Sequence, residues 1–259
     1  MKDLFDVAGK VALVTGGSRG IGEMIAEGFV ASGVKTYISA RKAEACDATA
    51  ARLSEIGECI SVPADLSSAE GITALVDNLK SREERLDILV NNAGAVWGEP
   101  IETFPESAWD KVMTINVKSP FFLTQALLPL LENAASNDDP ARVIMVGSID
   151  GINVNNMPTF AYGPSKAAVH HLARVLAAHL APRNITANAI APGLFPSHMT
   201  AATIEKHGDR IAQGTPLKRH GRPEDMAGVA IYLASKAASF VTGIVIPVDG
   251  GITGAKPTL

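Results

Sequence analysis

Short hydrophobic runs alternate with longer amphipathic segments along the whole chain. The runs predict strands at residues 10–15, 35–40, 59–63, 86–90, 142–147, 185–191 and 244–248. The segments between them repeat apolar residues at helical spacing and predict helices at 20–32, 43–56, 69–82, 107–135, 161–181 and 223–234. This alternation is typical of βαβ units. It predicts an α/β, Rossmann-like, doubly wound parallel sheet of about seven strands with helices on both faces.

No linker or shift in composition divides the chain, so we expect one domain over residues 1–259. The cofactor half would span about residues 8–150, and the catalytic and substrate half about residues 141–259. Two segments show no clear periodicity. We expect residues 132–140 to form a polar surface loop, and residues 195–220 are long enough to form a lid over a ligand.

The composition excludes several classes of protein. Hydrophobic residues make up 47% of the chain and charged residues 19%, which is typical of a globular protein. The net charge is −4 without a basic tract, so no nucleic-acid partner is expected. No apolar run is long enough to span a membrane, and the N-terminal residues lack the apolar core of a signal peptide. Cys46 and Cys59 are therefore expected to be reduced thiols in a cytoplasmic protein.

A glycine-rich loop follows the first predicted strand and opens the first predicted helix. Its sequence is TGGSRGIG, at residues 15–22. Glycines allow a tight turn and a close approach of the backbone to a pyrophosphate, and the helix N-terminus offers unpaired N–H groups. A merely structural turn is the alternative. We predict cofactor contacts from Gly16, Ser18, Arg19, Gly20, Ile21 and Gly22.

The end of the second predicted strand favours NADP(H) over NAD. A carboxylate there would bind the ribose 2′-hydroxyl of NAD and repel a 2′-phosphate. This chain instead has Arg41 and Lys42, and Arg19 lies within the glycine loop. Two guanidinium groups can bind one phosphate together, so Arg19 and Arg41 are candidate contacts. In the alternative interpretation, Arg41 and Lys42 are only the solvated start of a helix.

Tyr162 and Lys166 lie four residues apart at the start of a long predicted helix, in the sequence YGPSK. Residues at this spacing share one helix face and can point into one site. We expect the nearby ammonium to lower the pKa of the phenol toward neutral pH. Ser148 follows the fifth predicted strand at the same edge of the sheet, and its hydroxyl could hold a substrate oxygen.

With these pieces the chain resembles the classical short-chain dehydrogenase/reductase family over nearly its whole length. The matching segments are TGGSRGIG, the NNAG motif at residues 91–94, YGPSK and the Pro-Gly turn at residues 192–193. The family's catalytic tetrad matches Asn116, Ser148, Tyr162 and Lys166. The segments GGSRGIG, YGPSK, APGLFPSHMT and VIPVDGG further resemble the NADPH-dependent β-ketoacyl reductases of this family.

The resemblance implies a role for each tetrad residue. Tyr162 would donate a proton to the carbonyl oxygen, and Ser148 would hydrogen-bond to that oxygen. Lys166 would lower the pKa of Tyr162 and hold the ribose hydroxyls. Asn116 would anchor a water molecule in a proton relay, although it could also only stabilise a helix kink. Hydride would pass from the nicotinamide to the carbonyl carbon.

The resemblance also implies further contacts with the cofactor. These residues are Asp65, Leu66, Asn92, Ala93, Gly94, Tyr162, Lys166, Pro192, Gly193, Phe195 and Ser197. Asp65 would bind the adenine amino group, or it could be an acid at the start of the next helix. Asn91 and Gly94 would pass near the ribose, or could only tie loops together and form a tight turn. Ser197 stands where many relatives have threonine.

Apolar residues in the loops at the carboxyl edge suggest an acyl chain or another hydrophobic ketone as substrate. With Ser148, the substrate candidates are Trp97, Phe160, Leu194 and Met199. These apolar side chains could instead pack the lid. His170 and His171 are adjacent and do not share a helix face, and no HExxH motif is present, so no metal site is expected.

Family members that act on acyl carrier protein typically carry basic residues near the turn before the fifth strand. Residues 132–140 are acidic here (ENAASNDDP) and are expected to repel an acidic carrier protein, although Arg183 could serve at another point. A CoA-linked or free ketone is a comparable alternative. The resemblance also implies a homotetramer, built on two long helices and the C-terminal strand.

Three functions compete at this point. The first is NADPH-dependent reduction of a ketone, with a β-ketoacyl thioester as the favoured substrate. The second is NAD(P)-dependent oxidation of a polyol, sugar acid or other secondary alcohol by the same residues. The third is a non-enzymatic NADP(H)-binding sensor or scaffold. The presence of both Tyr162 and Lys166 argues against the third.

Overall fold

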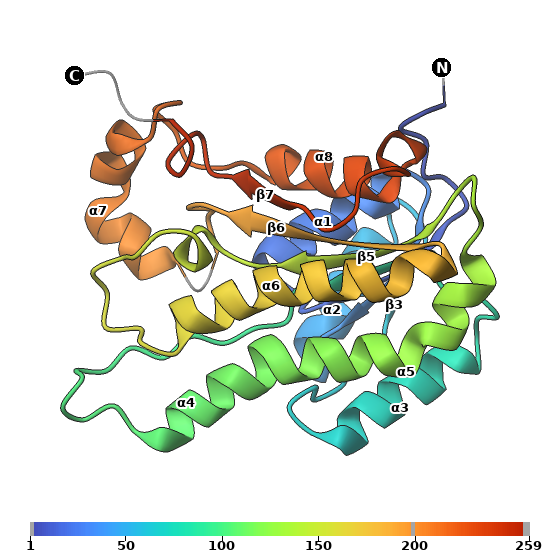
Figure 1. The fold of residues 1–259 in the computed structure, drawn as a ribbon, viewed down its shortest axis with the longest axis horizontal. Helices are drawn as coiled ribbons and strands as arrows, with labels where there is room; N and C mark the ends of the chain where they lie inside the picture. Colours follow the sequence, from blue (N-terminus) through green and yellow to red (C-terminus); the bar gives the residue numbers. More distant parts are fainter. Residues whose placement is uncertain (1–2, 198–199, 256–259) are drawn as a thin grey trace.

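A single sheet of seven parallel strands forms the centre of the molecule (Figure 1). The computed structural model describes residues 3–197 and 200–255, without the side chains of residues 202 and 203. Across the sheet the strands are β3 (Cys59–Ser61), β2 (Lys35–Ser39), β1 (Val11–Thr15), β4 (Ile88–Asn91), β5 (Ala141–Val146), β6 (Ile185–Pro192) and β7 (Val245–Val248). This arrangement confirms the predicted doubly wound fold. The strand order changes direction between β1 and β4, and ligands bind at such switch points.

Helices cover both faces of the sheet and bury it completely in its centre. One core joins the sheet to α1 (Gly20–Ala31), α2 (Ala43–Leu53) and α8 (Pro223–Ala234). The other core joins it to α3 (Ala69–Lys80), α5 (Ser119–Ala134) and α6 (Tyr162–Leu180). Every residue of β1, β5 and β6 is buried, which explains why these strands are continuous hydrophobic runs rather than alternating patterns.

The long helix expected at residues 107–135 is interrupted in the structure. It consists of α4 (Glu106–Met113), a π-helical turn (Thr114–Lys118) and α5. Pro120 has no amide hydrogen, so the regular ladder of hydrogen bonds cannot continue through it. The Ser119 hydroxyl donates instead to the carbonyl oxygens of Thr114 (2.9 Å) and Leu66 (2.5 Å). The break places Asn116 in the turn, with its side chain buried.

The expected lid contains a helix that the sequence pattern did not predict, α7 (Ala201–Gly214). Its core-facing pattern is sparse, because the helix has few large apolar residues and two glycines. The Thr200 hydroxyl donates to the carbonyl oxygen of Phe195 (2.6 Å) just before the helix begins. In Figure 1 α7 lies beyond the carboxyl ends of β6 and β7, where a lid would have to be.

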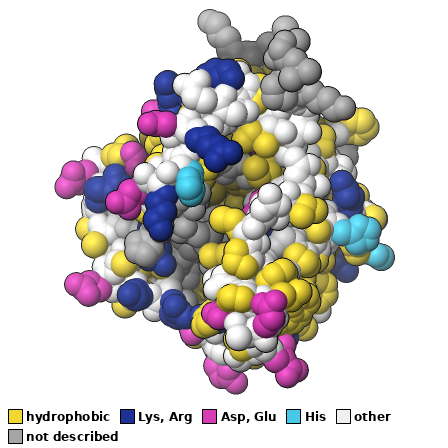
Figure 2. All heavy atoms as spheres, turned by 90° about the vertical axis from the view of Figure 1, so that its left-hand side faces the viewer, with side chains coloured by type: hydrophobic (Ala, Val, Ile, Leu, Met, Phe, Trp, Pro, Cys, Tyr) yellow, Lys and Arg dark blue, Asp and Glu magenta, His cyan; other side chains and the backbone are white. Residues whose placement is uncertain are grey.

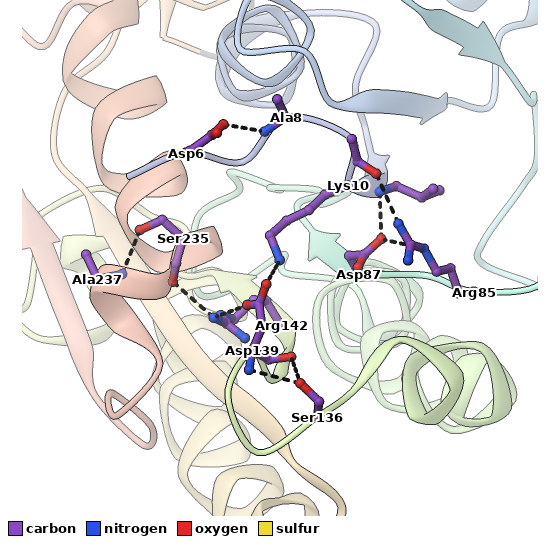
Figure 3. A network of polar contacts seen from close by, with 12 residues as sticks. Asp6, Ala8, Lys10, Arg85, Asp87, Ser136, Asp139, Arg142, Ser235 and Ala237 are labelled. Atoms are coloured by element: carbon purple, nitrogen blue, oxygen red, sulfur yellow. Dashed lines mark hydrogen bonds and ion pairs between the residues drawn. The ribbon is translucent and has the colours of Figure 1, made fainter. Parts of the chain in front are cut away.

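The expected polar loop begins later than predicted, because α5 extends to Ala134, and residues 135–140 lie at the amino edge of the sheet, where they lead directly into β5. The catalytic candidates follow the carboxyl ends of the strands, at the opposite edge. In Figure 3 the Asp139 carboxylate points inward and binds two cations. These are Lys10 Nζ at 2.6 Å and Arg142 Nη2 at 3.0 Å. The loop therefore lies at the edge opposite the expected site, and whether it repels a carrier protein stays a prediction.

Candidate active site

The glycine-rich loop between β1 and α1 leaves no space for side chains. Gly16 and Gly20 have φ angles of 65° and 57°, which favour glycine. A β-carbon at Gly16 would lie 2.7 Å from Asn92 Nδ2, and one at Gly22 would overlap the carbonyl oxygen of Gly16. Asn92 holds the loop by donating to the carbonyl oxygens of Thr15 (2.8 Å) and Gly16 (3.2 Å). The tight cradle leaves the N-terminus of α1 open to an anion.

The other predicted loop residues surround this cradle. Arg19 is the exposed, extended residue before α1, and Ile21 packs against the core. The carbonyl oxygen of Ser18 accepts a hydrogen bond from the Thr49 hydroxyl (3.0 Å). A β-carbon at Gly20 would lie 3.1 Å from Ser197 Cβ, so the β6–α7 loop passes directly over the glycine loop. A cavity of about 510 Å³, lined in part by Arg19, Gly20 and Ser197, opens here.

Arg41 and Asp65 lie near each other at the carboxyl ends of β2 and β3, and both are exposed. Hydrogen bonds from the Ser67 amide (3.0 Å) and hydroxyl (2.7 Å) lower the pKa of Asp65, and Arg41 lowers it further. The N-cap of α3 is Ser68, so Asp65 forms a turn before the helix rather than capping it. Leu66 is buried, and its carbonyl oxygen accepts the hydrogen bond from the Ser119 hydroxyl.

The NNAG motif at residues 91–94 follows β4, and its residues either hold the loops together or border the site. Asn91 is buried and donates to the Thr124 hydroxyl (3.1 Å), so it ties β4 to α5. The Ala93 amide donates to the Thr15 hydroxyl (3.0 Å), which joins this motif to the end of β1. Gly94 is exposed, and a β-carbon there would lie 3.1 Å from Asn116 Oδ1 and 3.6 Å from Lys166 Nζ. Gly94 therefore borders the catalytic candidates.

The four predicted tetrad residues come from three elements and meet at the carboxyl edge of β5. Ser148 follows β5, and Tyr162 and Lys166 occupy the first two turns of α6. The ammonium group of Lys166 is buried, donates to the carbonyl oxygen of Val146 (2.9 Å) and lies 5.6 Å from the centre of the Tyr162 ring. Asn116 reaches this group from the π-helical turn.

Asn116 is held by three hydrogen bonds. Its Oδ1 accepts from the Ala95 amide (2.8 Å), and its Nδ2 donates to the Ala95 carbonyl oxygen (3.0 Å) and the Ser165 hydroxyl (2.9 Å). The Ser165 hydroxyl donates in turn to the carbonyl oxygen of Tyr162 (2.6 Å). Sequence reasoning missed Ser165 as a link between two tetrad residues. The only available signal was its position beside Lys166 in YGPSK.

Burial governs the protonation of the two titratable tetrad residues. It raises the pKa of Tyr162 to about 12, although a hydrogen bond with Ser148 lowers it in part. It lowers the pKa of Lys166 to about 8. The expected lowering of the Tyr162 pKa by Lys166 is not found in this structure, because the net shift is upward, desolvation of the phenolate is its largest cause and Lys166 is not among its causes. Tyr162 is a neutral phenol at pH 7 and can donate a proton.

The predicted substrate residues lie in separate parts of the carboxyl edge. Trp97 and Phe160 are partly exposed, and Phe160 packs edge-on against Phe104 with ring centres 5.6 Å apart. Leu194 lines a cavity of about 640 Å³ between the α7 region and the segment after β7. Met199 lies outside the described residues. The apolar walls suit a hydrophobic substrate.

The β6–α7 loop contains several of the predicted contacts with the cofactor. The side chain of Phe195 is 2% exposed and belongs to the core, where a β-carbon at Gly221 would overlap its ring. Phe195 also lines the cavity of about 640 Å³ beside Leu194, and its contact with the cofactor stays a prediction. Pro192 ends β6, and Gly193 packs against Asp249. The Ser197 hydroxyl pairs with that of Thr200 (2.9 Å), a partner that sequence reasoning missed.

Figure 2 shows the carboxyl edge of the sheet face-on. Lys and Arg side chains gather mainly on the left of this view, interspersed with Asp and Glu side chains, and hydrophobic side chains gather in its centre and lower right. Among the described residues, no group of three or more His, Cys, Asp or Glu side chains could hold a metal ion. No described helix is both long and apolar enough to cross a membrane.

Comparison with known proteins agrees with this geometry. Residues 16–253 match the family described as Enoyl-(Acyl carrier protein) reductase. The chain is 51% identical to the rhamnolipids biosynthesis 3-oxoacyl-[acyl-carrier-protein] reductase of Pseudomonas aeruginosa, over 97% of this chain and 99% of that protein. It is 33% identical to the short-chain dehydrogenase/reductase PhomF of Diaporthe leptostromiformis, over 99% of this chain and 95% of that protein.

A solved structure matches almost the whole chain. The Pseudomonas aeruginosa RhlG/NADP active-site complex superimposes with a TM-score of 0.94 at 51% identity, covering 98% of this chain and all of that chain. These findings confirm the family predicted from the glycine loop, the NNAG motif and YGPSK, and the further resemblance to β-ketoacyl reductases. The chain belongs to the short-chain dehydrogenase/reductase family of oxidoreductases.

Proposed function

We propose that this protein uses NADPH to reduce a β-ketoacyl thioester to the secondary alcohol. The observation that carries the proposal is the meeting of Ser148, Tyr162 and the buried Lys166 ammonium beside Gly94, at the carboxyl edge of the sheet. The relatives named 3-oxoacyl-[acyl-carrier-protein] reductase support the substrate class. The bound NADP of the matching RhlG complex agrees with the predicted NADP(H).

The glycine loop fits the pyrophosphate of this cofactor. Side chains are excluded at Gly16 and Gly22, so a ligand can approach the backbone closely. Arg19 and Arg41 are exposed at the loop and at the end of β2, where they would hold the 2′-phosphate. Lys166 would hold the nicotinamide ribose hydroxyls, and Asp65 would face the adenine. NADPH supplies the hydride when it is bound.

The protein itself positions the carbonyl group and moves a proton. Ser148 would donate a hydrogen bond to the substrate oxygen and polarise it. Tyr162 would donate its phenolic proton to that oxygen as the alcohol forms, and its raised pKa keeps the proton in place beforehand. Asn116 and Lys166 border the same space at Gly94, so they can return a proton from solvent.

The acyl group could be carried by acyl carrier protein or by CoA, and the geometry of the site agrees with both carriers. The acidic loop at residues 135–140 lies at the amino edge and does not face the site, so it gives no reason to exclude acyl carrier protein. The partly exposed Trp97 and Phe160 would receive the acyl portion in either form. We keep acyl carrier protein and CoA as alternative carriers.

We propose that the protein assembles as a homotetramer in the cytoplasm. Apolar side chains on α5 and near β7 are exposed, among them Phe121, Phe122 and Phe240. Exposed apolar surface of this kind supports the homotetramer that the family resemblance implies. Cys46 and Cys59 are both buried and free, which agrees with a cytoplasmic location.

A substrate panel tests the proposal directly. NADPH oxidation is measured with acetoacetyl and longer β-ketoacyl thioesters on CoA and on acyl carrier protein, and with hydrophobic free ketones. We expect turnover with the thioesters and a clear preference for NADPH over NADH. Turnover only with NAD(P)⁺ and a polyol or sugar acid would support a dehydrogenase instead. Tight NADPH binding without any turnover would support a sensor or scaffold.

A further inference from the structure

A buried histidine lies directly behind the turn that carries Ser148. His170 is on α6, one helical turn beyond Lys166, and its side chain is 4% exposed. The Ser148 amide donates to His170 Nε2 at 3.4 Å. The imidazole therefore contacts the backbone of a tetrad residue from the side opposite the solvent. The mechanism proposed above does not use this group.

Gly147 and Gly151, on either side of Ser148 in sequence, both pack against the imidazole ring of His170. A β-carbon at Gly147 would overlap His170 Nε2, and one at Gly151 would lie 2.8 Å from His170 Cε1. The backbone of residues 147–151 therefore packs tightly against the imidazole, so a movement of the ring would displace the turn that carries Ser148. The segment has a second anchor, because the Gly147 amide donates to the carbonyl oxygen of Ile190 (2.7 Å).

The side chain of Ser148 is oriented by its own backbone. Ser148 is extended, with φ −168° and ψ 155°, and its hydroxyl oxygen accepts from the Asp150 amide (3.1 Å). That bond occupies a lone pair of the oxygen, so the hydroxyl proton can point toward Tyr162, as in this structure, or toward a substrate oxygen bound beside Tyr162. Because the direction of the proton depends on the backbone of residues 148–150, a group that fixes this backbone also aims the hydroxyl.

Only a neutral imidazole can accept the hydrogen bond from the Ser148 amide. Burial lowers the pKa of His170 to about 4, and the charges of Lys166 and Arg174 on the same helix lower it further. A backbone hydrogen bond with Gly151 acts in the opposite direction and is weaker. The ring is therefore an acceptor throughout the neutral range.

We infer that His170 is a positioning residue, which holds the Ser148 backbone through Nε2 and so aims the Ser148 hydroxyl at the carbonyl oxygen of the substrate. The inference rests on the proposed function, in which Ser148 polarises that oxygen. His170 touches neither substrate nor cofactor, and its effect on the reaction passes entirely through Ser148. Its loss should thus slow the chemical step without weakening the binding of NADPH.

Three variants of the full-length protein separate the acceptor from the bulk of the ring. His170→Leu keeps an apolar side chain of similar size but removes the acceptor. His170→Gln places an amide oxygen near the position of Nε2 and should restore it. His171→Leu changes the adjacent, exposed histidine and is the matched control. The measurements are kcat and KM with a β-ketoacyl thioester, the Kd of NADPH and the melting temperature.

We expect His170→Leu to lower kcat about tenfold, less than the roughly 10²-fold or greater loss for a donor that touches the reacting oxygen, because His170 acts through Ser148. The Kd of NADPH should stay within twofold of the unchanged protein, and His170→Gln should recover at least half of the lost kcat. In a Ser148→Ala background, His170→Leu should cause no further loss, because both changes remove the same interaction. A merely structural role would instead lower kcat by a similar factor in both backgrounds.

The outcomes distinguish this inference from the proposed function. If Ser148→Ala keeps full activity, the role of Ser148 in the proposed function is wrong. If Ser148→Ala loses activity but His170→Leu does not, only the role of His170 is wrong. Should His170→Leu fail to fold, His170→Met provides the same comparison with His170→Gln. Equal kcat values for folded His170→Gln and His170→Met would overturn the inference.

Discussion

A buried cation lies at each edge of the sheet, but within the part of the chain that the structure describes only the cation at the amino edge has an acidic partner. At the amino edge the buried Arg142 guanidinium pairs with Asp139 and donates to the carbonyl oxygens of Leu233 (3.2 Å) and Ser235 (3.0 Å) (Figure 3). At the carboxyl edge the buried Lys166 ammonium donates to one carbonyl oxygen, that of Val146. No acidic side chain of the described residues forms an ion pair with Lys166.

This difference separates a region that stabilises the fold from one prepared for chemistry. Burial lowers the pKa of both Arg142 and Lys166, but of the two only Arg142 has a carboxylate within the described residues that opposes the shift, and groups with an unopposed shift are candidates for functional sites. A buried charge with a partner instead becomes part of the structure, and removal of the partner is costly. We therefore expect changes at the carboxyl edge to affect the reaction, and changes at the amino edge to affect the free energy of unfolding.

The largest effect is expected at Tyr162. Tyr162→Phe removes the proton donor and keeps the ring, so kcat should fall about 10³-fold, within the usual range for general acid catalysis. The Kd of NADPH and the melting temperature should be nearly unchanged. Tyr232→Phe, on α8, is the matched control and should retain full activity. Normal reduction of ketones by Tyr162→Phe would show that another group supplies the proton.

The opposite pattern is expected at Asp139. Asp139→Ala leaves the buried Arg142 and the nearby Lys10 without their carboxylate, so the free energy of unfolding should fall by about 3 kcal/mol. Denaturant unfolding measures this, and the kcat of the folded protein should not change. Asp138→Ala, at the exposed neighbouring acid, should have almost no effect. A loss of kcat without a loss of stability would contradict the division between the edges.

Arg41 tests the anion-binding side of the carboxyl edge. Arg41→Asp replaces a cation by a carboxylate where the 2′-phosphate is expected, so the preference for NADPH over NADH should fall about 100-fold, as expected for loss of a charge-assisted hydrogen bond and added repulsion. The ratio of kcat/KM for the two cofactors measures it. Lys42→Asp makes the same change of charge one residue along and should have a smaller effect. An unchanged preference in Arg41→Asp would show that Arg41 is only solvated.

A smaller effect concerns the pH dependence of stability. The pKa of His170 is about 4 in the folded protein, below its usual value of 6.5. Between these values the unfolded chain binds one more proton than the folded protein, so stability should fall by about 1 kcal/mol per pH unit as the pH drops from 6.5 toward 4. His170→Gln should lose this part of the slope, as measured by denaturant unfolding at several pH values. Identical slopes would show that the imidazole is not buried in its neutral form.

The elements with strong periodicity were predicted almost to the residue. The helix expected at residues 223–234 is α8, which begins at Pro223, where a missing amide hydrogen costs nothing. The predicted strand at 35–40 differs from β2 by one residue. These elements succeed because their hydrophobic faces are set by local sequence and are buried by a sheet that the same pattern requires.

The two elements that the sequence pattern did not predict, the π-helical turn and α7, have a different origin. The π-helical turn around Asn116 depends on Pro120 and on the contact of Ser119 with Leu66, which lies far away in sequence. The helix α7 is amphipathic but has only two large apolar residues, Ile204 and Ile211, and it lies beyond the carboxyl ends of β6 and β7 (Figure 1). In both cases long-range contacts decide the local structure, and a pattern read along the chain does not contain them.

The sequence by itself determined the family and the parallel sheet and predicted the residues of the candidate site, because glycine loops, strand ends and the spacing of Tyr162 and Lys166 are local features. Only the tertiary structure decided how each group is charged and which edge it occupies. It buried the Tyr162 phenol and raised its pKa, carried the acidic loop to the far edge, and brought His170 against Ser148. The physical reason is that desolvation and packing depend on neighbours from distant parts of the chain.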